Sequence, residues 1–555
     1  MEKLGRFSSC RGVPFEIQPR GCSPFAIEVP TQDESPQYGQ KIWLPWNKKS
    51  SFKVFPIMSD GIQRSMSRPS SHFCDLANDD DEDDFVTSVI EGDEDEESNT
   101  DLEQQEQVAH VPSRRELPPK VAKPRESRLS VILLDQGLFT VYKRLFVVCL
   151  AINLICLVLA ATGSFPYAKN RATLFSIGNI LALTLCRSEA MLRVVFWLAV
   201  KVLGRSWVPL PLKTATTSFL QCLGGIHSGC GVSSIIWLVY SLVLTLKDRD
   251  NTSSGIIAVA SSILSLLCLS SLAAFPLVRH LHHNIFERTH RFAGWTALAL
   301  LWAFIILTLS YDPISKSYDN LRFSRFIKAQ EFWFTLTITI VIILPWVTVR
   351  RVPVKVSAPS GHASIIKFEG GVKAGILGRI SPSPLSEWHA FGIISDGEKD
   401  HMMLAGAVGD FTKSLVSKPP SHLWVRQVHF AGLPYLVNMY DRVLLVATGS
   451  GICVFLSFLL QPSSADVCIL WVAKGIEQNF GKEIKEAVSG FPKEKVIVHD
   501  TAVLGRPNVS QMSIDAVKKW GAQVVIVTSN PEGSRDVVDA CKGAGIPAFG
   551  PIWDS

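Results

Sequence analysis

The sequence predicts a polytopic α-helical membrane bundle of six spans, followed by a small β-barrel and a parallel α/β domain. Three observations predict this order. Apolar segments crowd the middle of the chain, short β-like runs follow after Val352, and continuous apolar runs alternate with helical stretches from residue 441. At 555 residues and 47% hydrophobic content, the chain is too long for one core and apolar enough to contain a membrane-embedded part.

Residues 1–130 are rich in serine, proline and acidic side chains and show little periodic apolar pattern. The acids gather in "DLANDDDEDD" (75–84) and "EGDEDEESNT" (91–100). Such a composition cannot bury enough apolar surface to order a chain, so we predict a disordered acidic cytosolic tail. The net charge of +5 is small, and its distribution indicates no nucleic-acid partner.

The predicted transmembrane domain covers residues 140–350. Crossing a hydrocarbon core takes about 20 apolar residues, and most of the apolar segments approach this length. The second segment is short unless it extends past Arg187. The six segments are 145–163, 172–186, 217–246, 256–278, 292–310 and 332–349.

Basic residues flank the segments on alternate sides, which predicts the topology. They cluster before the first span, between the second and third, between the fourth and fifth, and after the sixth. These loops are therefore predicted to be cytoplasmic, and Asn251 of the sequon "NTS" falls on the opposite side. We expect a multi-pass protein embedded in the lipid bilayer of the plasma membrane or an endomembrane, with both termini cytosolic.

The pattern of apolar and turn-forming residues changes twice after the last span. Residues 352–440 contain short β-like runs separated by Gly, Pro and Ser, which predicts a small β-barrel. Residues 441–555 alternate buried strands with helical stretches, which is typical of a parallel sheet. The strand runs of this second domain are "RVLLVATGSG", "VCILWVAKG", "KVIVHD" and "QVVIVTSN".

The first of these strands ends in the glycine-rich turn "ATGSGICVFLSFL" (447–459). Gly449 and Gly451 would let backbone N–H groups and a helix N-terminus approach a pyrophosphate closely. A tight turn without a ligand is an equally good explanation of this stretch taken alone.

Six local motifs agree in type and order with one family. They are "RATLFSIGNILALTLCRSEAMLR" (171–193), "LPWVTVRRVPV" (344–354), "EWHAFGIIS" (387–395), "GDFTKSL" (409–415), "VLLVATGSGICVFLS" (443–457) and "GRPN" (505–508). From about residue 140 onward, the chain resembles the ferric reductase and NADPH oxidase superfamily. Within it, the similarity is to TmpA-type membrane flavoproteins related to the reductase-like tails of some adenylate-forming proteins.

The resemblance implies a ferredoxin-reductase-like FAD domain followed by an NAD(P)-binding α/β domain. FAD and NAD(P)H are the implied cofactors. A flavin needs an apolar wall, a polar ring-edge contact and donors for two phosphates. The implied binding residues are His389 and Phe391 for the ring, Gly409, Asp410 and Thr412 for the pyrophosphate, and Gly449 and Gly451 for the nicotinamide nucleotide.

Three positions depart from the family pattern. Ala390 and Gly392 replace the usual Pro and Thr of the flavin motif, and Val454 stands where the glycine loop commonly has Pro. The usual late Cys-Gly-Pro is replaced by "TSNP" (528–531). Because the hydroxyl that would contact the flavin ring edge is missing, we expect weakened FAD binding that Gly392→Thr would strengthen. The changes in the nicotinamide-nucleotide motifs argue against hydride transfer from NAD(P)H.

Histidines in two of the predicted spans are candidate ligands of a haem iron. The resemblance implies a haem ligand at His290, with a partner thirteen residues further on, where this chain has Ala303. In the third span, His227 has no second histidine thirteen or fourteen residues away. Two haems about 20 Å apart need two such pairs, so a two-haem electron path is not predicted.

Three interpretations of these side chains stay open. His227 and His290 could hold a single haem. The stripe formed by His280, His283, Glu287 and His290 could bind a metal ion. The stripe could also be structural, fixing the depth of a helix end at the membrane surface.

Two classes of function follow. The first is an integral membrane flavoprotein that moves electrons from NAD(P)H through FAD to an acceptor near the cytosolic membrane face. The second is a catalytically degenerate membrane sensor or scaffold that retains the reductase fold. The intact phosphate-type segments favour the first class, and the missing haem pair favours the second.

Overall fold

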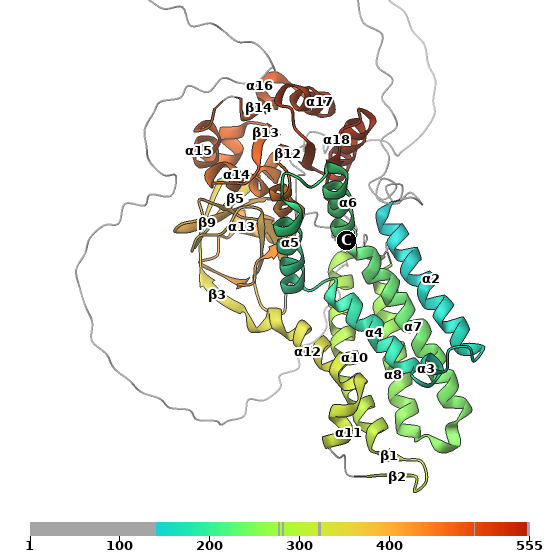
Figure 1. Ribbon diagram of the computed structural model, residues 1–555. Coiled ribbons are helices and arrows are strands. Elements are labelled where there is room, and N and C mark those ends of the chain that lie inside the picture. Colours follow the sequence, from blue (N-terminus) through green and yellow to red (C-terminus); the bar gives the residue numbers. More distant parts are fainter. Residues whose placement is uncertain (1–139, 276–277, 280–281, 320–322, 493, 552–555) are drawn as a thin grey trace, which may run out of the picture.

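The computed structural model describes residues 140–275, 278–279, 282–319, 323–492 and 494–551. The predicted acidic tail at 1–130 lies outside these residues. Figure 1 shows a helical bundle at one end of the molecule and the C-terminal sheets at the other, with α12 leading from the bundle into the first strand of the sheets.

The helical part contains ten helices longer than one turn among the described residues. They are α2 (Val141–Ala161), α3 (Pro166–Asn170), α4 (Ala172–Leu185), α5 (Glu189–Leu203), α6 (Leu210–Gln221), α7 (Leu223–Lys247), α8 (Ser254–Ala273), α10 (His283–Ser310), α11 (Phe323–Lys328) and α12 (Gln330–Val347). A two-stranded hairpin, β1 (Tyr311–Asp312) with β2 (Ser317–Tyr318), lies at the end of the bundle away from the sheets (Figure 1).

In the described part of the chain, five helices are long and apolar enough to cross a membrane: α2, α7, α8, α10 and α12. The expectation of six full-length spans is wrong for the second segment, because α4 has only 14 residues. The Ser188 hydroxyl accepts a hydrogen bond from Met191 N and starts α5 there. A new helix therefore begins where the second span would have continued.

The predicted third span is also divided, because α6 ends at Gln221 and α7 begins at Leu223. α7 meets α2 closely: a Cβ atom at Gly225 would lie 2.2 Å from Tyr142 O, and one at Gly229 would lie 2.9 Å from Cys149 Cβ. Small residues four apart allow two helices to approach in this way. α6 instead faces the C-terminal half, where the Thr217 and Tyr440 hydroxyls are 2.7 Å apart.

The predicted barrel region forms two antiparallel sheets. One has the order β11-β6-β10-β3 with β7 paired to β6, and the other has the order β4-β5-β9-β8. Since no strand pairing between the two sheets is seen in the described residues, closure into a barrel stays a prediction. The strands are β3 (Val349–Pro353), β4 (Lys355–Ser360), β5 (Ala363–Glu369), β6 (Ile376–Ser381), β7 (His389–Gly392), β8 (Ile394–Ser395), β9 (Asp400–Gly406), β10 (His422–Arg426) and β11 (Phe430–Ala431).

The prediction of a parallel sheet in the last domain is confirmed. Its strands pair in the order β14-β13-β12-β15-β16, all parallel. The order reverses between β12 and β15, which is where ligands bind in open α/β sheets. The strands are β12 (Arg442–Thr448), β13 (Asp466–Ala473), β14 (Val496–Asp500), β15 (Val524–Thr528) and β16 (Ala548–Phe549).

Helices cover both faces of this sheet. α15 (Ile476–Ser489) packs into the core shared with the antiparallel sheets, and α17 (Val509–Trp520) and α18 (Pro531–Gly543) cover the opposite face. The shared core also takes in Phe196 of α5 and Leu220 of α6. The helical part and the C-terminal half are therefore joined by a common apolar core.

Candidate functional site

The predicted flavin motif and the predicted nucleotide turn meet at one junction. The turn forms a three-ten helix, η3 (Gly449–Val454), that packs against β7. A Cβ atom at Gly392 would lie 2.8 Å from both the N and the Cα of Val454 and 2.6 Å from its Cγ1. Two departures from the family pattern, Gly392 and Val454, are thus in direct contact, and the small residue permits that contact.

The ring side of the flavin motif is closed by neighbouring side chains. The His389 ring stacks on the Phe411 ring, with the centroids 4.4 Å apart and the planes 7° from parallel. Phe391 is 1% exposed and belongs to the shared core. In this conformation, a flavin ring reaches neither face of Phe391, so the predicted wall would have to open first.

The predicted pyrophosphate segment starts α13 (Asp410–Ser417). Thr412 Oγ1 accepts hydrogen bonds from Val408 N and Gly409 N, both at 3.0 Å, and donates to Gly409 O. This clamp shapes the turn before the helix and leaves the first-turn N–H groups to face a ligand. The exposed Asp410 carboxylate at the same end opposes a phosphate electrostatically.

The glycine-rich turn is more buried than predicted. Gly449 adopts a positive φ of 53°, and its carbonyl accepts a hydrogen bond of 2.9 Å from Trp471 Nε1. Gly451 is buried, and the helix expected after the turn is only α14 (Ser457–Leu460). Burial raises the pKa of the Cys453 thiol to about 12, which keeps it protonated. The binding roles of Gly449 and Gly451 stay predictions, and Gly449 is the better exposed of the two.

Polar groups that the sequence analysis missed lie at the reversal point of the parallel sheet. The Thr448 and Ser529 hydroxyls, at the carboxyl ends of β12 and β15, are 2.8 Å apart. Asn530 accepts a hydrogen bond from Gly533 N at 2.8 Å and caps α18. The "TSNP" stretch, first noted only as a departure, thus ends a strand and starts a helix at the expected ligand edge.

The structure brings His227 and His290 together, from α7 and α10, with their ring centroids 6.4 Å apart. His227 Nδ1 lies 3.0 Å from Leu183 O, and His290 Nδ1 lies 2.7 Å from Ser270 Oγ. A carbonyl oxygen only accepts, so His227 Nδ1 donates to it, and in the neutral ring Nε2 is then the acceptor nitrogen. Metal-bound histidines are oriented in the same way.

The described residues contain no cluster of three or more His, Cys, Asp and Glu able to hold a metal ion, and the four-residue metal stripe stays a prediction because not all of its side chains are among them. Glu287 is paired instead with Arg291, one turn along α10. His280 lies outside the described residues.

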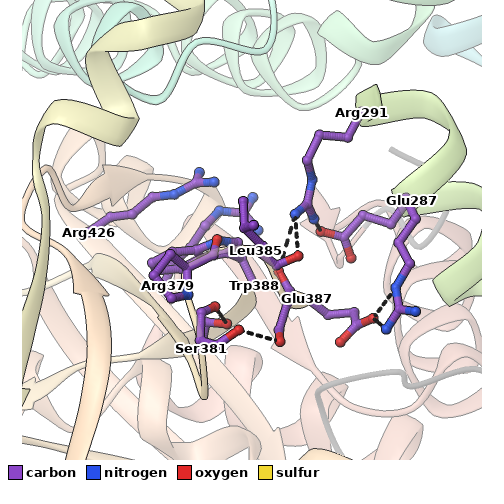
Figure 2. A network of polar contacts seen from close by, with 12 residues as sticks. Glu287, Arg291, Arg379, Ser381, Leu385, Glu387, Trp388 and Arg426 are labelled. Carbon is purple, nitrogen blue, oxygen red and sulfur yellow. Dashed lines mark hydrogen bonds and ion pairs between the residues drawn. The ribbon is translucent and has the colours of Figure 1, made fainter. Parts of the chain in front are cut away.

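A polar network fixes the bundle to the antiparallel sheets (Figure 2). From α10, Arg288 Nη2 lies 2.6 Å from Glu387 Oε1, and Arg291 donates to the carbonyls of Leu385 and Ser386, both at 3.2 Å. Leu385 and Glu387, labelled in Figure 2, precede β7, which begins at His389, so α10 is tied to the segment that carries His389.

Glu189 of α5 forms a second tie that the sequence analysis missed. Its carboxylate, 8% exposed, accepts from Arg426 at 2.9 Å and from Arg379. Arg426 also lies over the Trp388 ring, 4.7 Å from its centroid. The signal in the sequence was a lone acid in a basic loop, which is not specific enough to indicate a partner.

The comparisons with known proteins match the last domain to a family model and most of the chain to two relatives. Residues 433–555 match the family model for the C-terminal domain of adenylate-forming reductase 03009. Adenylate-forming reductase 03009 of Coprinopsis cinerea is 33% identical over 494 residues, covering 88% of this chain and 46% of the relative. Adenylate-forming reductase 06235 of the same fungus is 34% identical over 429 residues, covering 76% of this chain and 41% of the relative. The chain therefore spans less than half the length of these adenylate-forming reductases.

Among solved structures, phthalate dioxygenase reductase overlaps 36% of this chain and 68% of its own, with 10% identity and a TM-score of 0.29. Ferredoxin-NADP+ reductase from Plasmodium falciparum overlaps 36% of this chain and 94% of its own, with 10% identity and a TM-score of 0.28. At these scores, the overlap carries no conclusion about ligands or chemistry.

Proposed function

We propose that this chain is an integral membrane oxidoreductase-like protein that moves electrons from NAD(P)H through FAD to an acceptor near the cytosolic membrane face. One observation carries the proposal. Three parts of the molecule meet around the β7 and α13 segments. At the nucleotide-type edge of the parallel sheet, η3 contacts β7. At the His290 end of the bundle, α10 contacts the loop before β7. A membrane reductase needs this arrangement of parts.

The phosphate half of FAD fits the residues present, whereas the ring half requires movement. The first-turn N–H groups of α13, in the turn that Gly409 and Thr412 shape, would hold the pyrophosphate, and the imidazole of His389 stands next to them through its stack on Phe411. FAD would supply hydride acceptance and release of single electrons. The burial of Phe391 and the contact of Gly392 with Val454 keep this part of β7 away from solvent.

NAD(P)H would be held at the reversal point of the parallel sheet. Thr448 and Ser529 offer hydroxyls at the carboxyl ends of neighbouring strands, and Gly449 follows Thr448 with a positive φ in the turn that would meet a phosphate. These groups bind and orient a dinucleotide, and nothing in the described residues requires them to exchange protons.

The described part of the bundle brings together one histidine pair that would hold a haem iron, His227 and His290. Their ring centroids are 6.4 Å apart, so these two imidazoles would be the residues that bind the iron, and a haem there would supply one-electron chemistry. Further along α10, where a second haem would need a ligand, the bundle is filled by a core that includes Leu301 and Ile305. A pyridine haemochrome assay should give one haem or fewer per chain, and two would refute this proposal.

The proposal is tested on the full chain purified in detergent. We expect flavin absorbance after purification with added FAD, and NAD(P)H oxidation with an artificial acceptor. Thr412→Val should lower FAD retention, because it removes the clamp on Val408 N and Gly409 N. Ser417→Ala, at the exposed far end of the same helix, is the matched control and should leave retention unchanged.

The second candidate function is a membrane sensor or scaffold without electron transfer. The observation that favours it is the closed contact between Gly392 and Val454, together with the burial of Phe391. Protein that binds NAD(P)H but retains no flavin, even with excess FAD present, would decide for this candidate.

A further inference from the structure

Helix α5 is apolar on two opposite faces. One face packs into the core of the C-terminal half through Phe196, which is 4% exposed, with Leu192 and Val195 beside it. This contact, together with Glu189 bound to Arg426 and Arg379, fixes the helix against the antiparallel sheets. The second face is therefore not free to turn inward.

That second face is exposed and consists of large apolar side chains. Val194 is 56% exposed, Trp197 47%, Leu198 50% and Val202 52%. Positions 194, 198 and 202 lie four residues apart, so they form one stripe along the helix. A helix of a soluble domain normally carries polar residues on its outer face. An apolar stripe of this size marks a surface that another phase or molecule covers.

The charges on this stripe are basic. Lys201 Nζ lies 4.7 Å from the centre of the Trp197 ring, and Arg205 follows in the exposed turn after the helix. The single acid of α5, Glu189, points into the sheets and is neutralised there. Apolar and tryptophan side chains next to lysine and arginine are the composition of helices that lie in an anionic membrane surface.

The position of α5 agrees with this composition. The apolar helix α4 ends at Leu185, and only three residues separate it from Glu189, where α5 begins. Figure 1 shows α5 leading away from the end of α4, alongside the C-terminal sheets. The exposed stripe therefore continues the apolar surface of the bundle towards the C-terminal half.

We propose that the exposed stripe of α5 lies in the cytosolic leaflet of the membrane and contacts anionic lipid through Lys201 and Arg205. This inference rests on the proposed membrane location of the bundle. Its consequence is that α5 holds the C-terminal half against the membrane surface, because its other face belongs to the core of that half. Electron output would then be delivered at the headgroup level.

The test is photo-crosslinking of the full chain in bilayer nanodiscs that contain anionic and zwitterionic lipid. Benzoylphenylalanine replaces Leu198, and adducts are identified by mass spectrometry. Two further positions calibrate the result: Val148 on α2, 52% exposed, and Val503 on α16 (Thr501–Leu504), 71% exposed. We expect lipid adducts at 198 and 148 and none at 503, with a severalfold preference for anionic lipid at 198 that Lys201→Glu with Arg205→Glu abolishes.

The possible failures can be told apart. Lipid adducts at 148 but not at 198 would overturn the role of α5 and leave the membrane bundle intact. Protein adducts at 198, either to a second copy or to residues 1–139, would overturn it in favour of a protein partner. Absence of lipid adducts at both 148 and 198 would refute the membrane location itself.

Discussion

The contact between β7 and η3 reverses the expectation that a threonine at position 392 would strengthen flavin binding. A Cβ atom at Gly392 would approach three atoms of Val454 to between 2.6 and 2.8 Å, and two of them are backbone atoms. Backbone cannot rotate away as a side-chain end can. A substitution must therefore push the three-ten turn off the strand.

The magnitude follows from the cost of overpacking, which is about 1–3 kcal/mol, whereas a restored ring-edge hydrogen bond contributes only about 1 kcal/mol. The steric cost therefore outweighs the gain. We expect Gly392→Ala to lower the thermal midpoint of the C-terminal half by roughly 2–12 °C, given about 2–4 °C per kcal/mol for a unit of about 200 residues. Gly392→Thr should lie at the upper end and lose flavin rather than gain it.

The assay is thermal unfolding of the full chain in detergent, followed by tryptophan fluorescence. Gly361→Ala is the matched control, because a Cβ there meets nothing within 4 Å, and it should change stability by less than about 0.5 kcal/mol. Val454→Ala should not rescue Gly392→Ala, since the clashing N and Cα atoms remain. An unchanged midpoint for Gly392→Ala would show that the two residues do not touch.

Three further predictions concern other parts of the molecule. Glu189→Gln should destabilise the full chain by about 3 kcal/mol in the same thermal assay, because two arginines lose a buried carboxylate. Glu331→Gln, which breaks an exposed ion pair, should cost less than about 1 kcal/mol. Equal effects of the two substitutions would refute the distinction between a buried and an exposed pair. Burial lowers the pKa of His429 to about 4, so between pH 6.5 and about 4 the unfolded chain binds the extra proton and stability falls as the pH falls. His429→Gln should flatten this pH dependence of the thermal midpoint, whereas the exposed His422→Gln should leave the slope unchanged. Asn251, at the exposed α7–α8 turn, should be glycosylated in a eukaryotic host, and occupancy of a sequon engineered at 278–279 instead would invert the predicted topology.

Local sequence patterns were sufficient for the broad architecture. Long apolar runs determine which segments can cross a bilayer, and five helices among the described residues have the required length and composition. Continuous apolar strands alternating with amphipathic helices determine a parallel sheet, because strands covered on both faces must be apolar throughout. These properties depend on neighbours along the chain, so the sequence alone determined them.

The tertiary structure decided what depends on neighbours across the chain. Three contacts join residues that lie tens to hundreds of positions apart in the sequence. They are Gly392 with Val454, His227 with His290, and Glu189 with Arg426. No periodicity encodes such pairs. They arise from how helices and sheets pack once formed, and this packing closes the flavin ring site, places the histidine pair and leaves one face of α5 exposed.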